Sequence, residues 1–104
     1  MLRRPLLILS VWLVLAASST HHTYADDVRG GQLARQWCAN CHVIRNGQSG
    51  GVPQGPPSFL AIARSGMTAD QLRAFLSHPH GAMPDLVLTR AEIDDLIGYI
   101  ETLR

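Results

Sequence analysis

Apolar residues recur every three or four positions in three stretches of the chain, which is the spacing of an amphipathic helix. The first stretch covers about 27–41 and carries two adjacent stripes, Leu33-Trp37-Cys41 and Gly30-Ala34-Cys38. The second runs from Thr68 to the residue before Pro79, and the third from Thr89 through Leu103. A short helical turn is predicted around 58–63. Because no stretch alternates strictly like a half-buried strand, the pattern predicts a small all-helical domain with long loops.

Two of these helices begin with the same capping signature. The segments 68–71 (TADQ) and 89–92 (TRAE) each place a threonine three residues before a glutamine or glutamate. In such a capping box the two side chains satisfy backbone N–H groups at the start of the helix, which would otherwise lack partners. The second and third helices are therefore predicted to start immediately after Thr68 and Thr89.

The first 25 residues have the organisation of a secretory signal peptide. A positively charged region, 1–4, precedes the stretch 5–17, which is apolar except for Ser10 and is shorter than the roughly 20 residues that span a bilayer. Thr23 and Ala25 place small residues at the −3 and −1 positions of a cleavage site, and Ala17-Ser18-Ser19 is a second candidate. We therefore predict a signal peptide at 1–25, a domain at 26–104, a periplasmic location and no stable membrane insertion after cleavage.

Composition narrows the class of protein. The 104 residues carry a net charge of +1, with 46% hydrophobic and 16% charged residues. Such a chain is not a disordered tail, and it lacks the basic excess of a nucleic-acid-binding protein. After removal of the signal peptide, the chain is at the size where a side-chain core alone rarely suffices. The sequence therefore predicts that a bound group, a metal ion or a disulfide stabilises the interior.

The candidate chemistry lies at the end of the first predicted helix, in the segment 38–42 (CANCH). Cys38, Cys41 and His42 have the C-x-x-C-H spacing of covalent c-type haem attachment. The two thiols can add to the two vinyl groups of one porphyrin, and the adjacent imidazole can bind the iron. A haem would also supply the missing core.

Three other interpretations of the two cysteines are weaker. A disulfide between Cys38 and Cys41 would close a short loop and stabilise little. A thioredoxin-like redox motif needs a βαβ context, which the pattern does not show. Half of a zinc site would need further ligands, and beyond His42 only His78 and His80 are available nearby.

The sixth position of a haem iron has four candidate ligands, namely Met67, Met83, His78 and His80. Met83 lies in a turn-rich segment, and Pro84 after it favours an extended backbone at Met83. Any single methionine can equally be a core residue. From the residues alone, the choice between these ligands stays open.

At this point the sequence resembles the class I c-type cytochromes, which are small monohaem electron carriers. The resemblance covers essentially the whole chain after the signal peptide. It is carried by the segment 38–42, by Gly30 eight residues before Cys38, and by the segment 96–100 (LIGYI) in the last helix. In this family the two terminal helices cross closely, and small residues at Gly30 and Gly98 fit that crossing, with Tyr99 packing beside it.

The resemblance implies a cytochrome c fold, with three main helices and long loops wrapped around one heme c bound through two thioethers. It makes Met83 the sixth ligand, so that His42 and Met83 hold the iron, and makes Pro56 the residue whose carbonyl accepts a hydrogen bond from the His42 imidazole. The implied function is single-electron transfer between a transient protein donor and acceptor, by a monomer that is not an enzyme.

Two further functions are kept as alternatives. One is a dedicated haem subunit of a periplasmic dehydrogenase or oxidase, which would copurify with a larger catalytic chain. The other is a ligand sensor or peroxidase, which would need an open sixth position at the iron.

Overall fold

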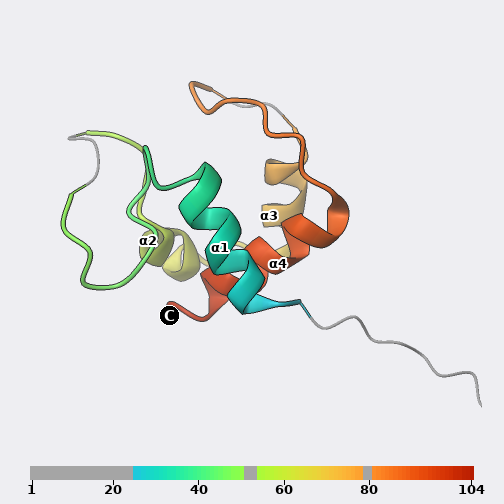
Figure 1. Cartoon of the computed structure of the whole chain (residues 1–104), viewed down its shortest axis with the longest axis horizontal. Helices are drawn as coiled ribbons and strands as arrows, with labels where there is room; N and C mark the ends of the chain where they lie inside the picture. The colour runs from blue at the N-terminus through green and yellow to red at the C-terminus, as the bar shows by residue number, and fades with distance from the viewer. Residues whose placement is uncertain (1–24, 51–53, 79–80) are drawn as a thin grey trace, which may run out of the picture.

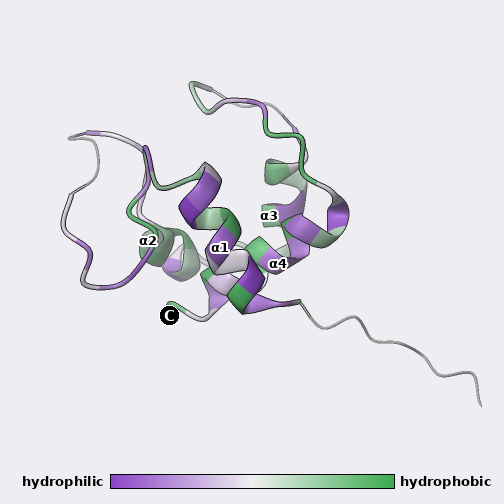
Figure 2. Ribbon diagram, in the orientation of Figure 1, coloured by the Kyte–Doolittle hydropathy of each residue, from purple (hydrophilic) through white to green (hydrophobic). Residues whose placement is uncertain are grey.

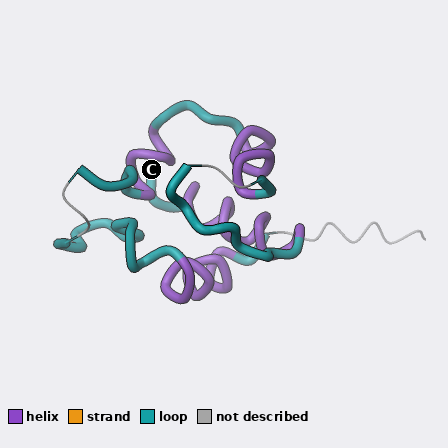
Figure 3. The backbone as a smooth tube through the Cα atoms, turned by 90° about the horizontal axis from the view of Figure 1, so that it is seen from above, coloured by secondary structure: helices purple, strands orange, loops and turns teal. Residues whose placement is uncertain are grey.

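The computed structural model describes residues 25–50, 54–78 and 81–104 and shows four helices and no β-strand in these ranges. They are α1 (Asp27–Trp37), α2 (Phe59–Arg64), α3 (Ala69–Leu76) and α4 (Arg90–Glu101). Figure 1 shows their arrangement, and Figure 3 shows the long loops that join them. The prediction of a small all-helical domain is confirmed, and the short turn expected around 58–63 is α2. The predicted signal peptide, apart from Ala25, lies outside the described residues.

Both predicted capping boxes are formed. The Thr68 side chain accepts a hydrogen bond from Gln71 N at 3.2 Å, and Thr68 N donates to Gln71 Oε1 at 2.8 Å. Thr89 and Glu92 make the same reciprocal pair at the start of α4, with the same two distances. These caps fix the helix starts through contacts only three residues apart, which is why the sequence could predict them.

The first helix ends earlier than its hydrophobic pattern predicts. It ends at Trp37 instead of Cys41, and Cys38 is its C-cap. The N–H groups of both Cys38 and Ala39 donate to the Ala34 carbonyl, at 2.9 and 3.0 Å, so the regular ladder stops there. One separate turn follows, because Cys41 N and His42 N both donate to Cys38 O, at 3.2 and 2.9 Å. A helix followed by a turn keeps the same apolar spacing, and the pattern alone could not tell the two apart.

The last helix, α4, packs against each of the other three, most extensively against α1. Figure 2 shows that hydrophobic and hydrophilic residues alternate along each of these helices. The main core cluster is formed by buried residues of α1, α2, α4 and the segments directly after α1 and α4: Leu33, Ala34, Cys38, Ile44, Phe59, Ala63, Leu96, Ile100 and Leu103. A smaller cluster joins α3 to α4 through Leu72, Ile93 and Ile97.

The two glycines expected at the contact of α1 and α4 face different neighbours. A Cβ atom added to Gly30 would lie 1.9 Å from Asp95 O and 2.8 Å from Tyr99 Cβ, so the backbones meet there, as expected. At Gly98 an added Cβ would lie 2.9 Å from the Cβ of Ala25, which comes just before α1, and the three nearest atoms all belong to Ala25. The small residue at Gly98 thus leaves room for the chain that enters α1.

Candidate haem-attachment site

The C-terminal end of α1 places the two cysteines in different environments. Cys38 is buried in the main core cluster, whereas Cys41 is exposed, and both thiols are free. Burial raises the pKa of the Cys38 thiol to about 11, because desolvation disfavours the thiolate. The turn between them, closed by hydrogen bonds to Cys38 O, puts the thiols and His42 on one short segment. No disulfide joins these two cysteines, in contrast to the first of the weaker interpretations.

His42 is held by a backbone carbonyl from the other side of the loop. Its Nδ1 lies 2.7 Å from Pro57 O. A carbonyl can only accept, so Nδ1 carries the proton and donates, which leaves Nε2 with a free lone pair. Such an outer hydrogen bond fixes the tautomer and the ring orientation of a ligating histidine and raises its basicity. The expectation placed this acceptor at Pro56; the structure places it one residue later.

Two further contacts position the imidazole, and sequence reasoning missed both. The His42 and Phe59 ring centroids are 5.4 Å apart with the rings tilted by 57°. Phe59 N donates to Val43 O at 2.9 Å, which ties the start of α2 to the residue after His42. In the sequence, the only hint of the Phe59 contact is that Phe59 directly follows Ser58, the residue that caps α2. These contacts join two segments about fifteen residues apart into one support for the histidine.

Three of the four candidates for the sixth position, His78, His80 and Met83, come between α3 and α4 in the sequence, and Met67 comes just before α3. Met83 is half-buried. Met67 packs against the small α3–α4 cluster and is therefore a core residue. His78 is exposed, and its Nδ1 lies 2.9 Å from Ala74 O at the end of α3. His80 lies outside the described residues. Figure 1 shows the segment 81–88 on the α3 side of the C-terminal end of α1, with the loop 43–50 on the opposite side.

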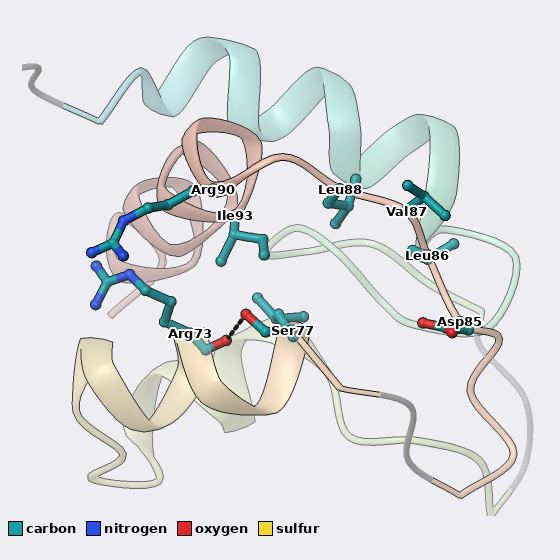
Figure 4. Close-up of a pocket in the computed structure, with 9 residues that line it drawn as sticks. Arg73, Ser77, Asp85, Leu86, Val87, Leu88, Arg90 and Ile93 are labelled. Atoms are coloured by element: carbon teal, nitrogen blue, oxygen red, sulfur yellow. Dashed lines mark hydrogen bonds between the residues drawn. The ribbon is translucent and has the colours of Figure 1, made fainter.

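A groove of about 380 Å³ lies between α3 and the segment 85–90. Five apolar residues line it, namely Leu76, Leu86, Val87, Leu88 and Ile93, together with Arg73, Ser77, Asp85 and Arg90. In Figure 4 the two arginines stand at one end and Asp85 at the other. The groove is lined by residues that follow Met83 in the chain, but none of Cys38, Cys41, His42 and Met83 lines it. It is therefore separate from the candidate haem-attachment turn.

The described residues fit a covalently attached haem. Two free thiols and an imidazole with an available Nε2 occupy one turn, and the imidazole is oriented by Pro57 O. Among the described residues, no group of three or more His, Cys, Asp or Glu side chains is placed to hold a metal ion by itself. Nor is any described helix long and apolar enough to span a membrane.

An all-helical fold with a C-x-x-C-H turn and a carbonyl-bound histidine defines a class I c-type cytochrome, an electron-carrying haem protein. Comparison with known proteins agrees. The family model described as "Cytochrome C oxidase, cbb3-type, subunit III" matches residues 25–100, and the chain belongs to this family. It is also similar to Cytochrome c-552 of Bradyrhizobium diazoefficiens, with 41% identity over 93 residues that cover 88% of each chain. No solved structure matches the chain.

Proposed function

We propose that this chain is an exported monohaem electron carrier in the periplasm, that it works as a monomer with transient protein donors and acceptors, and that it is not an enzyme. In this proposal residues 1–25 are a signal peptide and 26–104 are the cytochrome domain. The start of the family match at residue 25 supports that boundary, as does α1, which begins at Asp27.

The proposal assigns four residues to the haem. Cys38 and Cys41 would hold it through thioether bonds, and His42 Nε2 and the Met83 sulfur would be the two axial ligands. When bound, the haem iron supplies a one-electron couple, and methionine ligation raises its reduction potential relative to two histidines. The observation that carries the proposal is the 2.7 Å contact between His42 Nδ1 and Pro57 O, because it leaves Nε2 as the only ring nitrogen able to bind a metal.

The protein's own residues would keep this site rigid. Pro57 O and the Phe59 ring hold the imidazole, and burial of Cys38 in the main core cluster anchors the attachment turn. A site that changes little between two oxidation states suits electron transfer. Two occupied axial positions would also exclude oxygen and small ligands.

The experiment compares the spectrum and midpoint potential of the holoprotein with those of two matched variants. Met83→Leu and Met67→Leu each replace a thioether by an apolar side chain of similar volume, a change that usually costs little stability. We expect a low-spin wild type in both oxidation states, loss of the ferric methionine-to-iron charge-transfer band and a lower potential in Met83→Leu, and neither change in Met67→Leu.

Two results would overturn this assignment. If Met67→Leu and not Met83→Leu lost the band, the axial ligand would be Met67. If the wild type were high-spin and bound carbon monoxide or cyanide readily, the sixth position would be open, and the sensor or peroxidase alternative would replace the carrier.

A dedicated oxidase subunit is the second candidate function, and the description of the matching family is the observation that favours it. The match to Cytochrome c-552 extends over 88% of each chain, and this likeness to a protein named as a cytochrome c favours a separate small carrier. Purification from native cells distinguishes them, because a subunit stays with a membrane-bound catalytic chain after detergent extraction and a carrier is released with the periplasmic fraction.

A further inference from the structure

The backbone nitrogen of Asp26 is held by a buried carboxylate of α4. Asp26 N donates to Asp95 Oδ1 at 2.8 Å. Asp95 is only 8% exposed, and its second oxygen, Oδ2, lies 3.6 Å from Arg29 Nε. Figure 1 shows the beginning of the described chain close to α4, at the start of α1. A charged acceptor is thus aimed at one particular backbone nitrogen.

Asp26 is fixed independently of the residue that precedes it. Its side chain accepts a hydrogen bond from Arg29 N at 3.0 Å and caps α1. Its carbonyl accepts from Gly30 N at 2.8 Å. These contacts keep the Asp26 nitrogen beside Asp95 whether that nitrogen is part of a peptide bond or is the first atom of the chain.

The residue before it has a different relation to α4. Ala25 is exposed, and it occupies the space that Gly98 leaves open. The three atoms nearest to a Cβ added at Gly98 all belong to Ala25, the closest at 2.9 Å. Apart from the backbone of α4 itself and the two chain neighbours of Gly98, no other atom of the described residues comes closer to that position than 3.9 Å.

We propose that the signal peptide is removed between Ala25 and Asp26, and that the α-ammonium group released on Asp26 forms an ion pair with the buried carboxylate of Asp95. This inference rests on the export proposed above. In the cleavage, a signal peptidase adds one water molecule across the Ala25–Asp26 amide. The C–N bond breaks, the signal peptide is released with a carboxylate on Ala25, and the mature chain keeps an ammonium group on Asp26.

The ion pair replaces a neutral N–H donor by a charged one facing the same carboxylate, which adds the attraction of two opposite charges to a hydrogen bond that the carboxylate already strengthens. The charged groups of this contact network are the Asp95 carboxylate, the Arg29 guanidinium beside it, the Asp26 carboxylate and Glu92, which Arg29 also contacts; Asp27 follows Asp26 in the chain. Arg29 Nη2 lies 3.7 Å from Glu92 Oε1. An ion pair with the Asp95 carboxylate would favour the ammonium form, so the proposal predicts an α-amino pKa above the ordinary value of about 7.7–8.0. The stabilisation is complete below that ordinary value and is lost as the pH rises through the raised pKa.

The first experiment identifies the N-terminus of the exported holoprotein by Edman sequencing and intact mass. We expect the chain to start with Asp26-Asp27-Val28. A start at Ser18, Ser19 or any other residue overturns the cleavage site and leaves the export proposal standing. A full-length chain without haem would overturn both.

The second experiment measures the amine directly. The sequence contains no lysine, so the α-amino group is the only amine in the chain that an acylating reagent can label. We expect acetic anhydride at about pH 8 to label the holoprotein several-fold more slowly than a peptide with the same N-terminus, because the protected ammonium form is unreactive. The control is a holoprotein secreted with a signal that is cleaved before Ala25, whose amine should react like the peptide. Equal rates in all three overturn the ion pair.

Variants separate Asp95 from its other partner. Arg29→Gln removes the 3.6 Å contact to Asp95 but leaves the ammonium group in place. In this variant the thermal midpoint should still decrease as the pH is raised from about 7 to 10. Asp95→Asn should abolish both this fall and the slow acylation. If Arg29→Gln abolished them instead, the ion pair would be wrong.

Gly98→Ala gives an independent test of the cleavage site. In a chain that starts at Asp26 the new methyl group meets open space, and the thermal midpoint should stay equal or rise, because alanine favours a helix over glycine. In the control chain that retains Ala25 the same methyl group meets Ala25 Cβ, and the midpoint should fall. An equal fall in both chains would overturn the proposal.

Discussion

Replacing Gly30 by alanine tests the helix crossing on which the fold depends. The new Cβ would lie 1.9 Å from the carbonyl oxygen of Asp95, 2.6 Å from its carbonyl carbon and 2.8 Å from Tyr99 Cβ. Non-bonded carbon atoms are normally about 3.5–4.0 Å apart, so α1 and α4 must separate by more than about 1 Å. Two of these atoms belong to the backbone of α4, and no side-chain rotation can relieve the clash.

The expected cost follows from two opposing effects. Overpacking a core costs about 1–3 kcal/mol, and a clash with backbone belongs at the upper end of that range. Alanine returns about 0.8–1.0 kcal/mol through its better helix propensity. The net loss of unfolding free energy is therefore about 2 kcal/mol, which for a domain of this size lowers the thermal midpoint by about 8–16 °C.

The matched control is the neighbouring glycine. A Cβ added to Gly31 would lie 3.2 Å from Cδ2 and Cε2 of the Tyr99 ring, which can shift by a few tenths of an ångström. Thermal unfolding of the two holoproteins, followed by circular dichroism at 222 nm, should therefore show a large loss for Gly30→Ala and a change within about 1 kcal/mol for Gly31→Ala. Equal stability of Gly30→Ala and wild type would refute the close crossing of α1 and α4.

Three further predictions follow from single contacts. Tyr99→Phe removes the 2.7 Å hydrogen bond from the Tyr99 hydroxyl to Ile44 O. The free energy of unfolding measured in urea should therefore fall by about 1 kcal/mol. An unchanged value would mean that water replaces this bond at no cost. In the protein without haem, iodoacetamide at neutral pH should modify the exposed Cys41 faster than the buried Cys38, because burial raises the pKa of the Cys38 thiol to about 11. Equal rates would show that this part of the chain is not folded until the haem is attached. Hydrogen bonds from the Thr89 backbone and hydroxyl hold the pKa of Glu92 below its usual range, so its contribution to stability is present above the unfolded-state pKa and is lost as the pH falls through the folded-state pKa. Glu92→Gln should therefore flatten the acid side of the stability curve, and an unchanged curve would contradict that assignment.

The features that lie within a few residues of one another were the predictable ones. The structure places Cys38, Cys41 and His42 on one turn and forms the capping boxes of Thr68 and Thr89, because neighbouring residues decide these features. The roles of Cys38, Cys41 and His42 toward a haem stay a proposal. The choice of Met83 over the other axial candidates came from family resemblance, and it stays a proposal.

The helical class of the fold, the starts of α3 and α4 and the grouping of two thiols and an imidazole within five residues could all be predicted from sequence. Which of two adjacent prolines faces His42 depends on long-range packing, because the closing of a fifteen-residue loop brings Pro57, and not Pro56, to the imidazole. Long-range packing also decides that Cys38 is buried while Cys41 is exposed, since that depends on where α4 crosses α1. The contact of Gly98 with Ala25 likewise depends on how the start of the domain packs against α4. A helix pattern states which residues share a face, and the packing of other segments against that face decides what each residue meets.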